Sequence, residues 1–200
     1  MAVRNTGMDL SDHDTISLGL ISDTHGTLAS DLLPLLAECD VVVHAGDLVD
    51  PGELRQLTPR SGHVIVVRGN NDTPAQWPRG TEALLDTLPD QAEIALPGGL
   101  LVIEHGHRVN PARTRHERLR RRHPDARAIV YGHTHRRVID TDETPWVLNP
   151  GAAGRQRAYG GPGFLRLVAT RDDWHVEAVT LPKPARDTYT PRNRYSEGRP

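Results

Sequence analysis

The chain has almost no cysteine and few aromatic residues. Its single cysteine, Cys39, excludes an internal disulfide and a metal site built from thiolates. Aromatic residues make up 4% of the 200 residues, and no apolar run approaches the roughly 18 residues of a membrane-spanning helix. Residues 1–14 also lack the apolar segment of a signal peptide. We therefore expect a cytoplasmic protein without a membrane partner, in which His, Asp and Asn supply any metal ligands.

An excess of charge is absent as well. The chain has 24 Lys and Arg against 26 Asp and Glu, so its formal net charge is only −2. This balance does not demand nucleic acid or an anionic membrane as partner. A hydrophobic content of 36% over this length fits one domain, which we expect over residues 15–181. The segments 1–14 and 182–200 lack hydrophobic periodicity, and we expect both to be flexible.

Five short apolar runs each end in polar residues of metal-binding types. The runs are rich in β-branched and aliphatic residues, as buried strands are. They cover residues 16–21, 41–43, 64–67, 100–103 and 128–130. The first three runs are followed by Asp23 and His25, by Asp47, and by Asn70 and Asp72, respectively. The last two are followed by His105 and His107 and by His133 and His135. Ligands of open α/β sheets bind outside the carboxyl ends of the strands. The pattern therefore predicts one metal centre assembled from five loops.

The order of elements predicts an α/β protein with mixed sheets. Strands at 16–21, 41–44 and 64–68 alternate with helices near 28–38 and 51–57, which favours βαβ units and a parallel arrangement in the first half. The second half is expected to be more antiparallel, with a helix from Pro111 to Arg122 that Asn110 caps. Its predicted strands cover 92–96, 100–105, 128–131, 137–141, 146–149, 163–168 and 174–180.

The types and spacing of the polar residues predict two divalent ions. Asp23 and His25 lie two residues apart, as do His133 and His135, so in an extended segment both side chains of a pair point the same way. Asp47 has two oxygens that can bridge cations, and such mixed oxygen and imidazole ligands suit Mn²⁺, Ni²⁺, Fe or Zn²⁺ better than Ca²⁺ or Mg²⁺. We expect Mn²⁺, with Ni²⁺, Fe, Zn²⁺ or Mg²⁺ as alternatives. Seven candidate ligands are more than one ion needs. Two ions roughly 3.5–4 Å apart that share Asp47 would use all seven and favour in-line displacement at phosphorus.

These motifs, in this order, resemble those of the calcineurin-like metallophosphoesterases. The resemblance extends from Asp23 to His135, continues in Asn149-Pro150-Gly151, and is most similar to the small bacterial and archaeal phosphodiesterases. It implies a two-sheet α/β sandwich flanked by helices, with a dinuclear centre at its edge and a water or hydroxide between the ions as nucleophile. By the same resemblance the first ion is held by Asp23, His25, Asp47 and His135, and the second by Asp47, Asn70, His105 and His133.

The chain departs from the family pattern at Asn71. Many phosphatases of the wider family have a histidine there that assists the transition state or the leaving group, and the small branch commonly has cysteine. The leaving-group proton is therefore unassigned, and diesters with acidic leaving groups would depend least on it. Ala152 occupies a position that is often serine. We expect His107 to lie near the metals and Asp72 to orient Asn70.

Other polar residues have simpler interpretations. His44 is expected to be structural, and His13, His63, His116, His123 and His175 lack motif context. The arginines between positions 113 and 122 are more simply the solvated face of a helix than a substrate site. Arg155 and Arg157 are candidate phosphate contacts, because guanidinium binds phosphate through two hydrogen bonds. Cys39 and the three tryptophans are expected in or near the core.

The leading hypothesis is a metal-dependent phosphodiesterase that hydrolyses a small phosphoester. A second hypothesis is a non-catalytic interaction module, since a retromer coat subunit shares this fold with degraded metal residues, whereas this chain retains every ligand. A third is a nuclease or nucleotide-directed hydrolase that uses the arginine-rich helix. Near-neutral charge makes extended nucleic acid the less favoured partner. The sequence does not define an oligomeric state.

Overall fold

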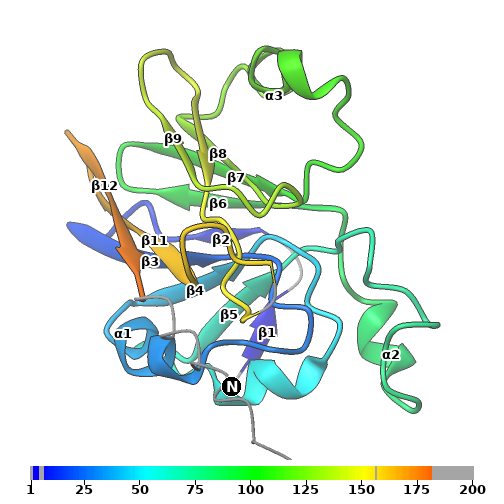
Figure 1. Ribbon diagram of the computed structural model, residues 1–200. Coiled ribbons are helices and arrows are strands. Elements are labelled where there is room, and N and C mark those ends of the chain that lie inside the picture. The colour runs from blue at the N-terminus through cyan, green and yellow to red at the C-terminus, as the bar shows by residue number, and fades with distance from the viewer. Residues whose placement is uncertain (1, 5–6, 156, 182–200) are drawn as a thin grey trace, which may run out of the picture.

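The computed structural model describes residues 2–4, 7–155 and 157–181, which form two packed six-stranded sheets (Figure 1). The first sheet has the order β1 (Ala2–Arg4), β5 (His63–Val66), β4 (Val41–His44), β3 (Thr15–Ile21), β11 (Gly163–Thr170) and β12 (Trp174–Thr180). The second has the order β2 (Met8–Asp9), β6 (Gln91–Leu96), β7 (Gly99–Glu104), β8 (Ala128–Tyr131), β10 (Trp146–Asn149) and β9 (Val138–Asp140). The predicted α/β sandwich of two mixed sheets is confirmed.

Strand direction follows the prediction in both halves of the chain. In the first sheet β1, β5, β4 and β3 run parallel, β11 pairs antiparallel with β3, and β12 pairs antiparallel with β11. In the second sheet β7, β8 and β10 are parallel neighbours, while β6 and β9 pair antiparallel with β7 and β10. As a result, β3, β4 and β5 present their carboxyl ends together, and so do β7 and β8.

Alternating side chains build three hydrophobic layers. Leu20 and Val43 of the first sheet pack with Ile103 and Val130 of the second to form the layer between the sheets. Residues one position along a strand point to the opposite face, where Val42 of β4 packs in the outer layer of the first sheet. A third layer lies outside the second sheet. Because the central strands are buried on both faces, their sequences are continuous apolar runs.

Short helices cover the outer faces, with α1 and α3 on opposite sides of the sandwich (Figure 1). They are η1 (Ser30–Leu32), α1 (Leu33–Ala37), η2 (Pro51–Gln56), α2 (Glu82–Leu85), η3 (Ala112–Thr114) and α3 (Arg115–Arg122). Gly19 of β3 lets α1 pack closely, since a Cβ atom there would lie 2.7 Å from Leu36 Cδ2. Within the described residues, no helix is long and apolar enough to cross a bilayer.

Several helix predictions differ from the structure in their bounds. The helix expected over 28–38 is the short pair η1 and α1, and the one expected over 51–57 is a 3-10 helix. Asn110 was predicted to cap a helix that begins at Pro111, but Pro111 itself precedes η3, and α3 begins only at Arg115. The helix α2 was not predicted, because four residues are too few to show a helical period.

The segment before residue 15, for which we expected flexibility, contains two short strands. β1 pairs with β5 and β2 pairs with β6, so this segment extends both sheets. Strands of two or three residues are too short to show alternation in the sequence, and they form because an existing edge offers unpaired backbone groups. The flexible terminus expected at 182–200 lies outside the described residues.

Candidate metal centre

Loops from both sheets bring the seven candidate ligands to one edge of the sandwich. Asp23 and His25 follow β3, Asp47 follows β4 and Asn70 follows β5, all in the first sheet. In the second sheet His105 follows β7, and the two ligand candidates His133 and His135 follow β8. Within the described residues, two sets have ligand atoms within 4.8 Å of one another, namely Asp23 with His25 and His135, and Asp23 with Asp47 and His105.

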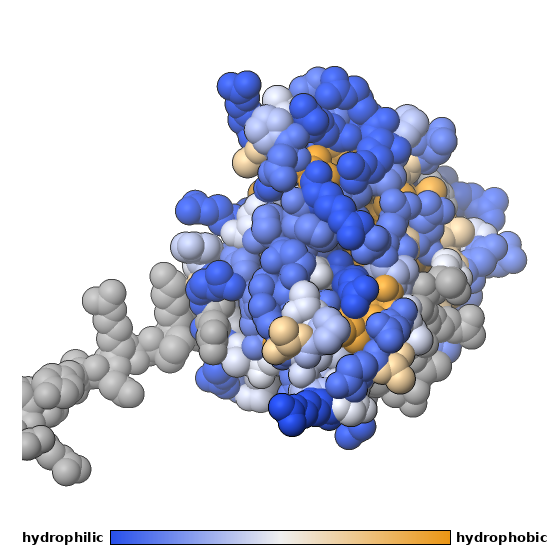
Figure 2. Space-filling model, turned by 90° about the vertical axis from the view of Figure 1, so that its right-hand side faces the viewer, coloured by the Kyte–Doolittle hydropathy of each residue, from blue (hydrophilic) through white to orange (hydrophobic). Residues whose placement is uncertain are grey.

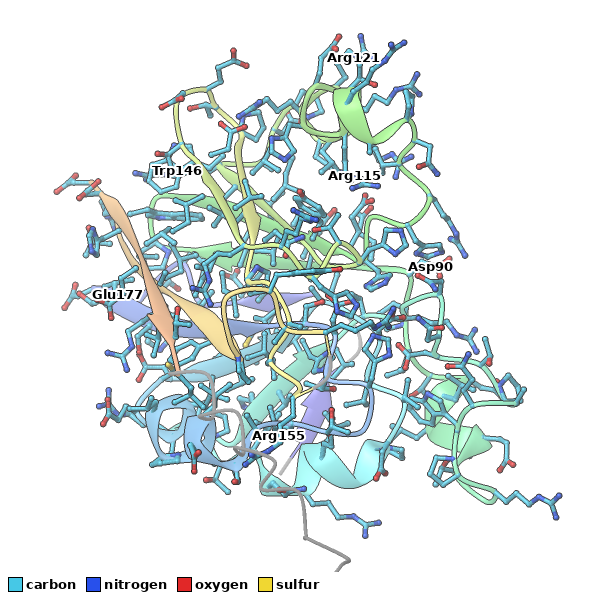
Figure 3. All side chains as sticks on the ribbon, in the orientation of Figure 1. Asp90, Arg115, Arg121, Trp146, Arg155 and Glu177 are labelled. Carbon is cyan, nitrogen blue, oxygen red and sulfur yellow. The ribbon has the colours of Figure 1, made fainter. Side chains whose placement is uncertain are left out.

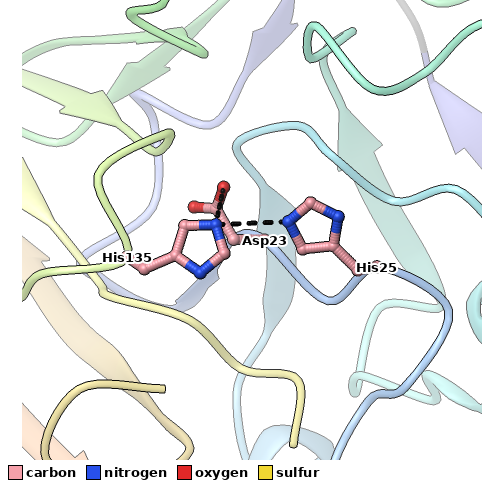
Figure 4. Close-up of side chains that lie close together, drawn as sticks. All are labelled: Asp23, His25 and His135. Atoms are coloured by element: carbon pink, nitrogen blue, oxygen red, sulfur yellow. Dashed lines mark hydrogen bonds and ion pairs between the residues drawn. The ribbon is translucent and has the colours of Figure 1, made fainter. Parts of the chain in front are cut away.

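The first set joins β3 and β8 loops that are 110 residues apart. His25 Nε2 and His135 Nε2 face each other at 3.2 Å, and His135 Nε2 lies 3.4 Å from Asp23 Oδ1 (Figure 4). Asp23 is fully buried, whereas His25 is partly open to solvent. Two imidazole nitrogens and a carboxylate oxygen therefore converge on one point, which is the arrangement that a divalent cation requires.

The second set is centred on Asp47. His105 Nε2 lies 3.3 Å from Asp47 Oδ2 and 3.2 Å from Asn70 Oδ1, and Asn70 Oδ1 lies 3.0 Å from His133 Nδ1. Asp47 Oδ2 is also 3.7 Å from His25 Nε2, which belongs to the first set. The carboxylate of Asp47 thus lies between His25 of the first set and the cluster formed by His105, Asn70 and His133.

The backbone at five of the candidate ligands is left-handed rather than extended, contrary to the prediction. The φ angles are 54° at Asp23, 47° at His25, 57° at Asp47, 68° at His133 and 57° at His135. Residues with a Cβ rarely adopt this conformation, and it tends to occur at functional sites. One consequence is that His133 and His135 do not act as a pair. His133 lies with Asn70, and His135 lies with Asp23.

Close backbone approaches hold these loops together. A Cβ on Gly69 would lie 2.2 Å from the amide nitrogen of Asp47, and a Cβ on Gly132 would lie 2.0 Å from Ser22 Oγ. Asp23 N donates to Gly46 O, and His25 N donates to Asp47 O, both at 3.0 Å. The glycines of the sequence motifs therefore allow neighbouring ligand loops to touch.

Asp72 fixes the loop that carries Asp47. Its buried carboxylate accepts from the backbone N–H groups of Asp47, Gly69 and Val49 at 2.9, 2.7 and 2.8 Å, and from Trp77 Nε1 at 3.0 Å. We expected Asp72 to orient Asn70, but its direct partners are the residue before Asn70 and the loop of Asp47. The prediction missed this because the sequence does not reveal which backbone groups face a carboxylate.

Asn71 holds the carboxylate of Asp47 itself. Its backbone N–H donates to Oδ1 and its side-chain Nδ2 donates to Oδ2, both at 2.7 Å. Burial alone would raise the pKa of the Asp47 carboxyl, but His105 and the two hydrogen bonds from Asn71 keep it well below its ordinary value. Asp47 is therefore ionised at neutral pH. From the sequence, Asn71 was only a departure from the histidine or cysteine of the family pattern, and its contact with Asp47 was not predicted.

Most of the histidines are held in the neutral form that binds metal. Burial lowers the pKa of His135 to about 4, with further lowering by Arg157 and His25, and burial also lowers the pKa of His25 and His133. His105 differs, because its hydrogen bond to Asp47 outweighs the burial that would lower its pKa. Its Nδ1 lies 2.8 Å from Ala45 O, which leaves Nε2 directed at the cluster.

Asp23 and His135 are only partly compensated by protein groups, although the backbone N–H of His133 donates to Asp23 Oδ2 at 3.0 Å. Burial raises the pKa of Asp23 to about 7. The Nδ1 atom of His135 is buried and has no hydrogen-bond partner among the described residues. A buried carboxylate beside neutral imidazoles is costly unless a cation balances it. These ligand types and their charges therefore fit divalent ions of the Mn²⁺ to Zn²⁺ group.

His107 lies at the border of the cluster. Its ring centre is 5.4 Å from that of His105 and 6.3 Å from that of His133, and its Nδ1 is buried without a partner in the described part of the chain. It lines two neighbouring surface hollows, one of which also includes Asn70. Its ring is therefore available to a molecule that reaches the cluster through these hollows.

The two predicted phosphate contacts lie in different places. Arg157 Nη2 is 3.2 Å from His25 Nε2, so this guanidinium lies at the first set of ligands. Arg155 Nη2 instead donates to Ser30 Oγ at 3.3 Å, and Figure 3 shows Arg155 near the helices below the first sheet. Of the two residues, only Arg157 contacts a candidate ligand among the described atoms.

The arginines of α3 have partners within the fold. Arg120 pairs with Asp140 at 2.6 Å, Arg121 with Glu117 at 2.7 Å, and Arg122 with Glu104 at 3.1 Å. These pairs reduce the positive charge that the helix offers to a substrate.

The histidines without motif context lie outside the two ligand sets. His116 and His123 bind Asp140 and Glu104 at 2.7 and 2.9 Å. His44 Nε2 lies 3.0 Å from Thr24 Oγ1 beneath the centre, as expected of a structural residue.

The fold and the centre together define the class of metallophosphoesterases, in which a two-sheet sandwich carries a cluster of Asp, Asn and His at one edge. More specifically, the chain belongs to the calcineurin-like phosphoesterase superfamily, whose domain model matches residues 16–172. It is similar to a phosphodiesterase of Methanocaldococcus jannaschii, with 24% identity over 151 residues that cover 68% of this chain and 83% of that protein.

Solved structures share the fold. A predicted phosphoesterase from Streptococcus pneumoniae superimposes with a TM-score of 0.58 and 22% identity over 84% of this chain and 91% of that one. Vps29 from Entamoeba histolytica, in complex with Zn²⁺, superimposes with a TM-score of 0.59 and 21% identity over 82% of this chain and 98% of that one. The resemblance to calcineurin-like phosphoesterases that the motifs indicated is confirmed.

Proposed function

We propose that the protein is a metal-dependent phosphodiesterase that hydrolyses a small phosphoester at this centre. The observation that carries the proposal is the convergence of imidazole nitrogens with the oxygens of Asp23, Asp47 and Asn70 from both sheets. The archaeal phosphodiesterase to which the chain is similar supports the same bond preference. A cytoplasmic location is part of the proposal and is in keeping with the single Cys39.

The seven residues divide into two ligand sets in this proposal. Asp23, His25, Asp47 and His135 hold the first ion, and Asp47, Asn70, His105 and His133 hold the second, with Mn²⁺ as the favoured metal. The contacts at Asp47 support a shared role, since its Oδ2 lies near both His25 and His105. When bound, two such ions polarise the phosphate oxygens and supply hydroxide at neutral pH for in-line attack on phosphorus.

Other residues of the chain position the reacting groups. Asn71 and Asp72 hold Asp47 through its carboxylate and its backbone. Arg157 is proposed to bind a phosphate oxygen, and His107 to contact the part of the substrate that enters through its hollows. Since Asn71 Nδ2 is already bonded to Asp47, we assign it no role as a leaving-group acid. Diesters with acidic leaving groups should therefore be the best substrates.

A non-catalytic interaction module is the second candidate. The similarity to Vps29, named for vacuolar protein sorting in a related structure, favours it at the level of the fold. The convergence of all seven candidate ligands favours an enzyme instead. Figure 2 shows a largely hydrophilic face on which hydrophobic residues form small separate patches, unlike the contiguous apolar surface typical of stable interfaces. A nuclease is less favoured, because the arginines of α3 are paired within the fold.

Metal removal and replacement test the proposal. Metal-stripped protein is resupplied with Mn²⁺, Ni²⁺, Zn²⁺ or Mg²⁺, and hydrolysis of bis-p-nitrophenyl phosphate and p-nitrophenyl phosphate is measured. We expect metal-dependent cleavage that favours the diester. The variant His133→Ala should lose it, while His175→Ala, which alters an exposed histidine on β12, should retain it. Stoichiometric metal binding without hydrolysis of either ester would instead support the interaction module.

A further inference from the structure

Tyr159 is an exposed aromatic residue at the rim of the metal centre. Its side chain is 59% exposed, whereas Tyr131, Phe164, Trp77 and Trp174 are buried. The residue follows Arg157 by two positions, in the loop between β10 and β11. An exposed aromatic ring offers a flat apolar surface on which another planar group can stack.

Two arginines connect the ring to the metal-ligand candidates. Arg136 Cζ lies 4.8 Å from the centre of the Tyr159 ring, and Arg136 directly follows His135 in the chain. Arg157 reaches His25 from the same loop, with 3.2 Å between Nη2 and Nε2. Tyr159 is therefore linked to His135 through Arg136, and it lies two positions along the chain from Arg157, the arginine that contacts His25.

The loop that carries Tyr159 is anchored on both sides. Gly154 forms a β-bridge with Leu28, and the backbone N–H of Arg155 donates to Thr27 O at 3.0 Å. Beyond the ring, Gly161 N donates to Ala158 O at 3.2 Å, and Leu181 N donates to Pro162 O at 2.9 Å. These contacts join the start of the loop to the segment that follows His25 and its end to the residue after β12, so both ends of the loop have fixed positions in the fold.

We propose that Tyr159 and Arg136 form a subsite for a planar aromatic group carried on the phosphoester. Arg136 covers one side of the ring, and the open side can stack with an aromatic group, as tyrosines do with bases of single-stranded nucleic acids. Arg157 binds the phosphate of the same molecule. The substrate class is thus a phosphoester of an aromatic-bearing alcohol, with a nucleobase or an aryl ring as the source. This inference rests on the proposed function, because it places the phosphate at the metal centre.

A simpler interpretation is that the Arg136 and Tyr159 pair only stabilises its loop. Binding measurements separate the two interpretations without requiring turnover. The affinities of Mn²⁺-loaded protein for adenosine 5′-monophosphate, phenyl phosphate and ribose 5-phosphate are compared by titration calorimetry. A stacking subsite predicts that adenosine 5′-monophosphate binds roughly 5- to 50-fold more tightly than ribose 5-phosphate. If phenyl phosphate is also preferred over ribose 5-phosphate by a similar factor, the site accepts aromatic groups in general. If phenyl phosphate is not preferred over ribose 5-phosphate, the site is selective for a nucleobase.

Variants assign the preference to the ring. Tyr159→Ala should lower the affinity for adenosine 5′-monophosphate to that for ribose 5-phosphate. Tyr159→Phe should keep the preference for adenosine 5′-monophosphate. Ile139→Ala is the matched control, because Ile139 is the other exposed large hydrophobic residue described, at 42%. Equal affinities in the wild type, or a preference that survives in Tyr159→Ala, would overturn the subsite. If the preference holds but no diester is hydrolysed with any metal, the subsite stands and the proposed function fails.

Discussion

Asn71 binds both oxygens of the Asp47 carboxylate, through its backbone N–H and its side-chain amide, each at 2.7 Å. A carboxylate held at two points has a fixed orientation and a pKa well below its ordinary range, to which His105 also contributes after the opposing effect of burial. Asn71, which the sequence marked only as a departure from the family pattern, thus orients the carboxylate that we propose both ions share.

Asn71→Ala should weaken the metal centre while leaving every proposed ligand in place. Loss of the side-chain hydrogen bond frees Asp47 Oδ2, and removal of such supporting contacts typically costs about 10- to 100-fold in metal affinity or activity. Manganese affinity is measured by competition with a chelator. Gln76→Ala is the control, because Gln76 is exposed and contacts Asn71 from the outer side at 3.3 Å. Equal loss in both variants would contradict a specific role for the contact to Asp47.

Asp47→Asn should be the most damaging single substitution. It replaces the ionised carboxylate near both His25 and His105 with a neutral amide. We expect metal content to fall from two ions to at most one per chain, with a loss of activity larger than the roughly 100-fold upper range for supporting residues. Metal is counted by mass spectrometry after gel filtration. Two ions retained with normal turnover would refute the shared role of Asp47.

Asp72→Asn should destabilise the fold as well as the centre. The carboxylate accepts four N–H groups, and an amide nitrogen in place of one oxygen would face donors that it cannot satisfy. The loss of hydrogen bonds to a buried charge is expected to cost about 2–3 kcal/mol in the free energy of unfolding. Urea unfolding of metal-free protein measures it. Asp172→Asn, in an exposed turn, is the control, and equal stability of the two variants would count against the prediction.

Asp23→Asn should stabilise the metal-free protein in a pH-dependent way. Burial raises the pKa of Asp23 from 3.8 to about 7 in the folded state. The unfolded chain therefore binds fewer protons than the folded chain between pH 4 and 7, so this group lowers stability as pH rises through that interval. The full loss of stability from burying ionised Asp23 is present above pH 7. The neutral asparagine of the variant avoids this loss.

Thermal unfolding of the metal-free wild type and of Asp23→Asn at pH 4.5 and pH 8 tests this dependence of stability on pH. The variant should gain stability at pH 8 and much less at pH 4.5, although it should bind metal less tightly than the wild type. A gain that is equal at both pH values would show that ionisation of Asp23 is not its cause. The expected opposition between stability and metal binding is common at functional sites.

The central strands were predicted to within a few residues because their sequences are buried on both faces. The run 16–21 lies in β3, and the run 128–130 lies in β8. The short helices were harder, since η1, α1 and η2 form where packing against the first sheet fixes them rather than where a helical period exists. β1 and β2 could not be predicted, because they depend on the edges of β5 and β6.

The sequence by itself determined where most strands lie along the chain and which residues are able to bind metal, because buried strands need apolar runs and ligands need particular side chains. Only the tertiary structure decided how those residues are arranged. It gives five of the candidate ligands a left-handed backbone, directs the Asp72 carboxylate to the backbone of the Asp47 loop, and brings the Asn71 amide to the Asp47 carboxylate. The contacts of Asn71 and Asp72 with Asp47 join the loops after β4 and β5, which become neighbours only when these two strands pair in the first sheet.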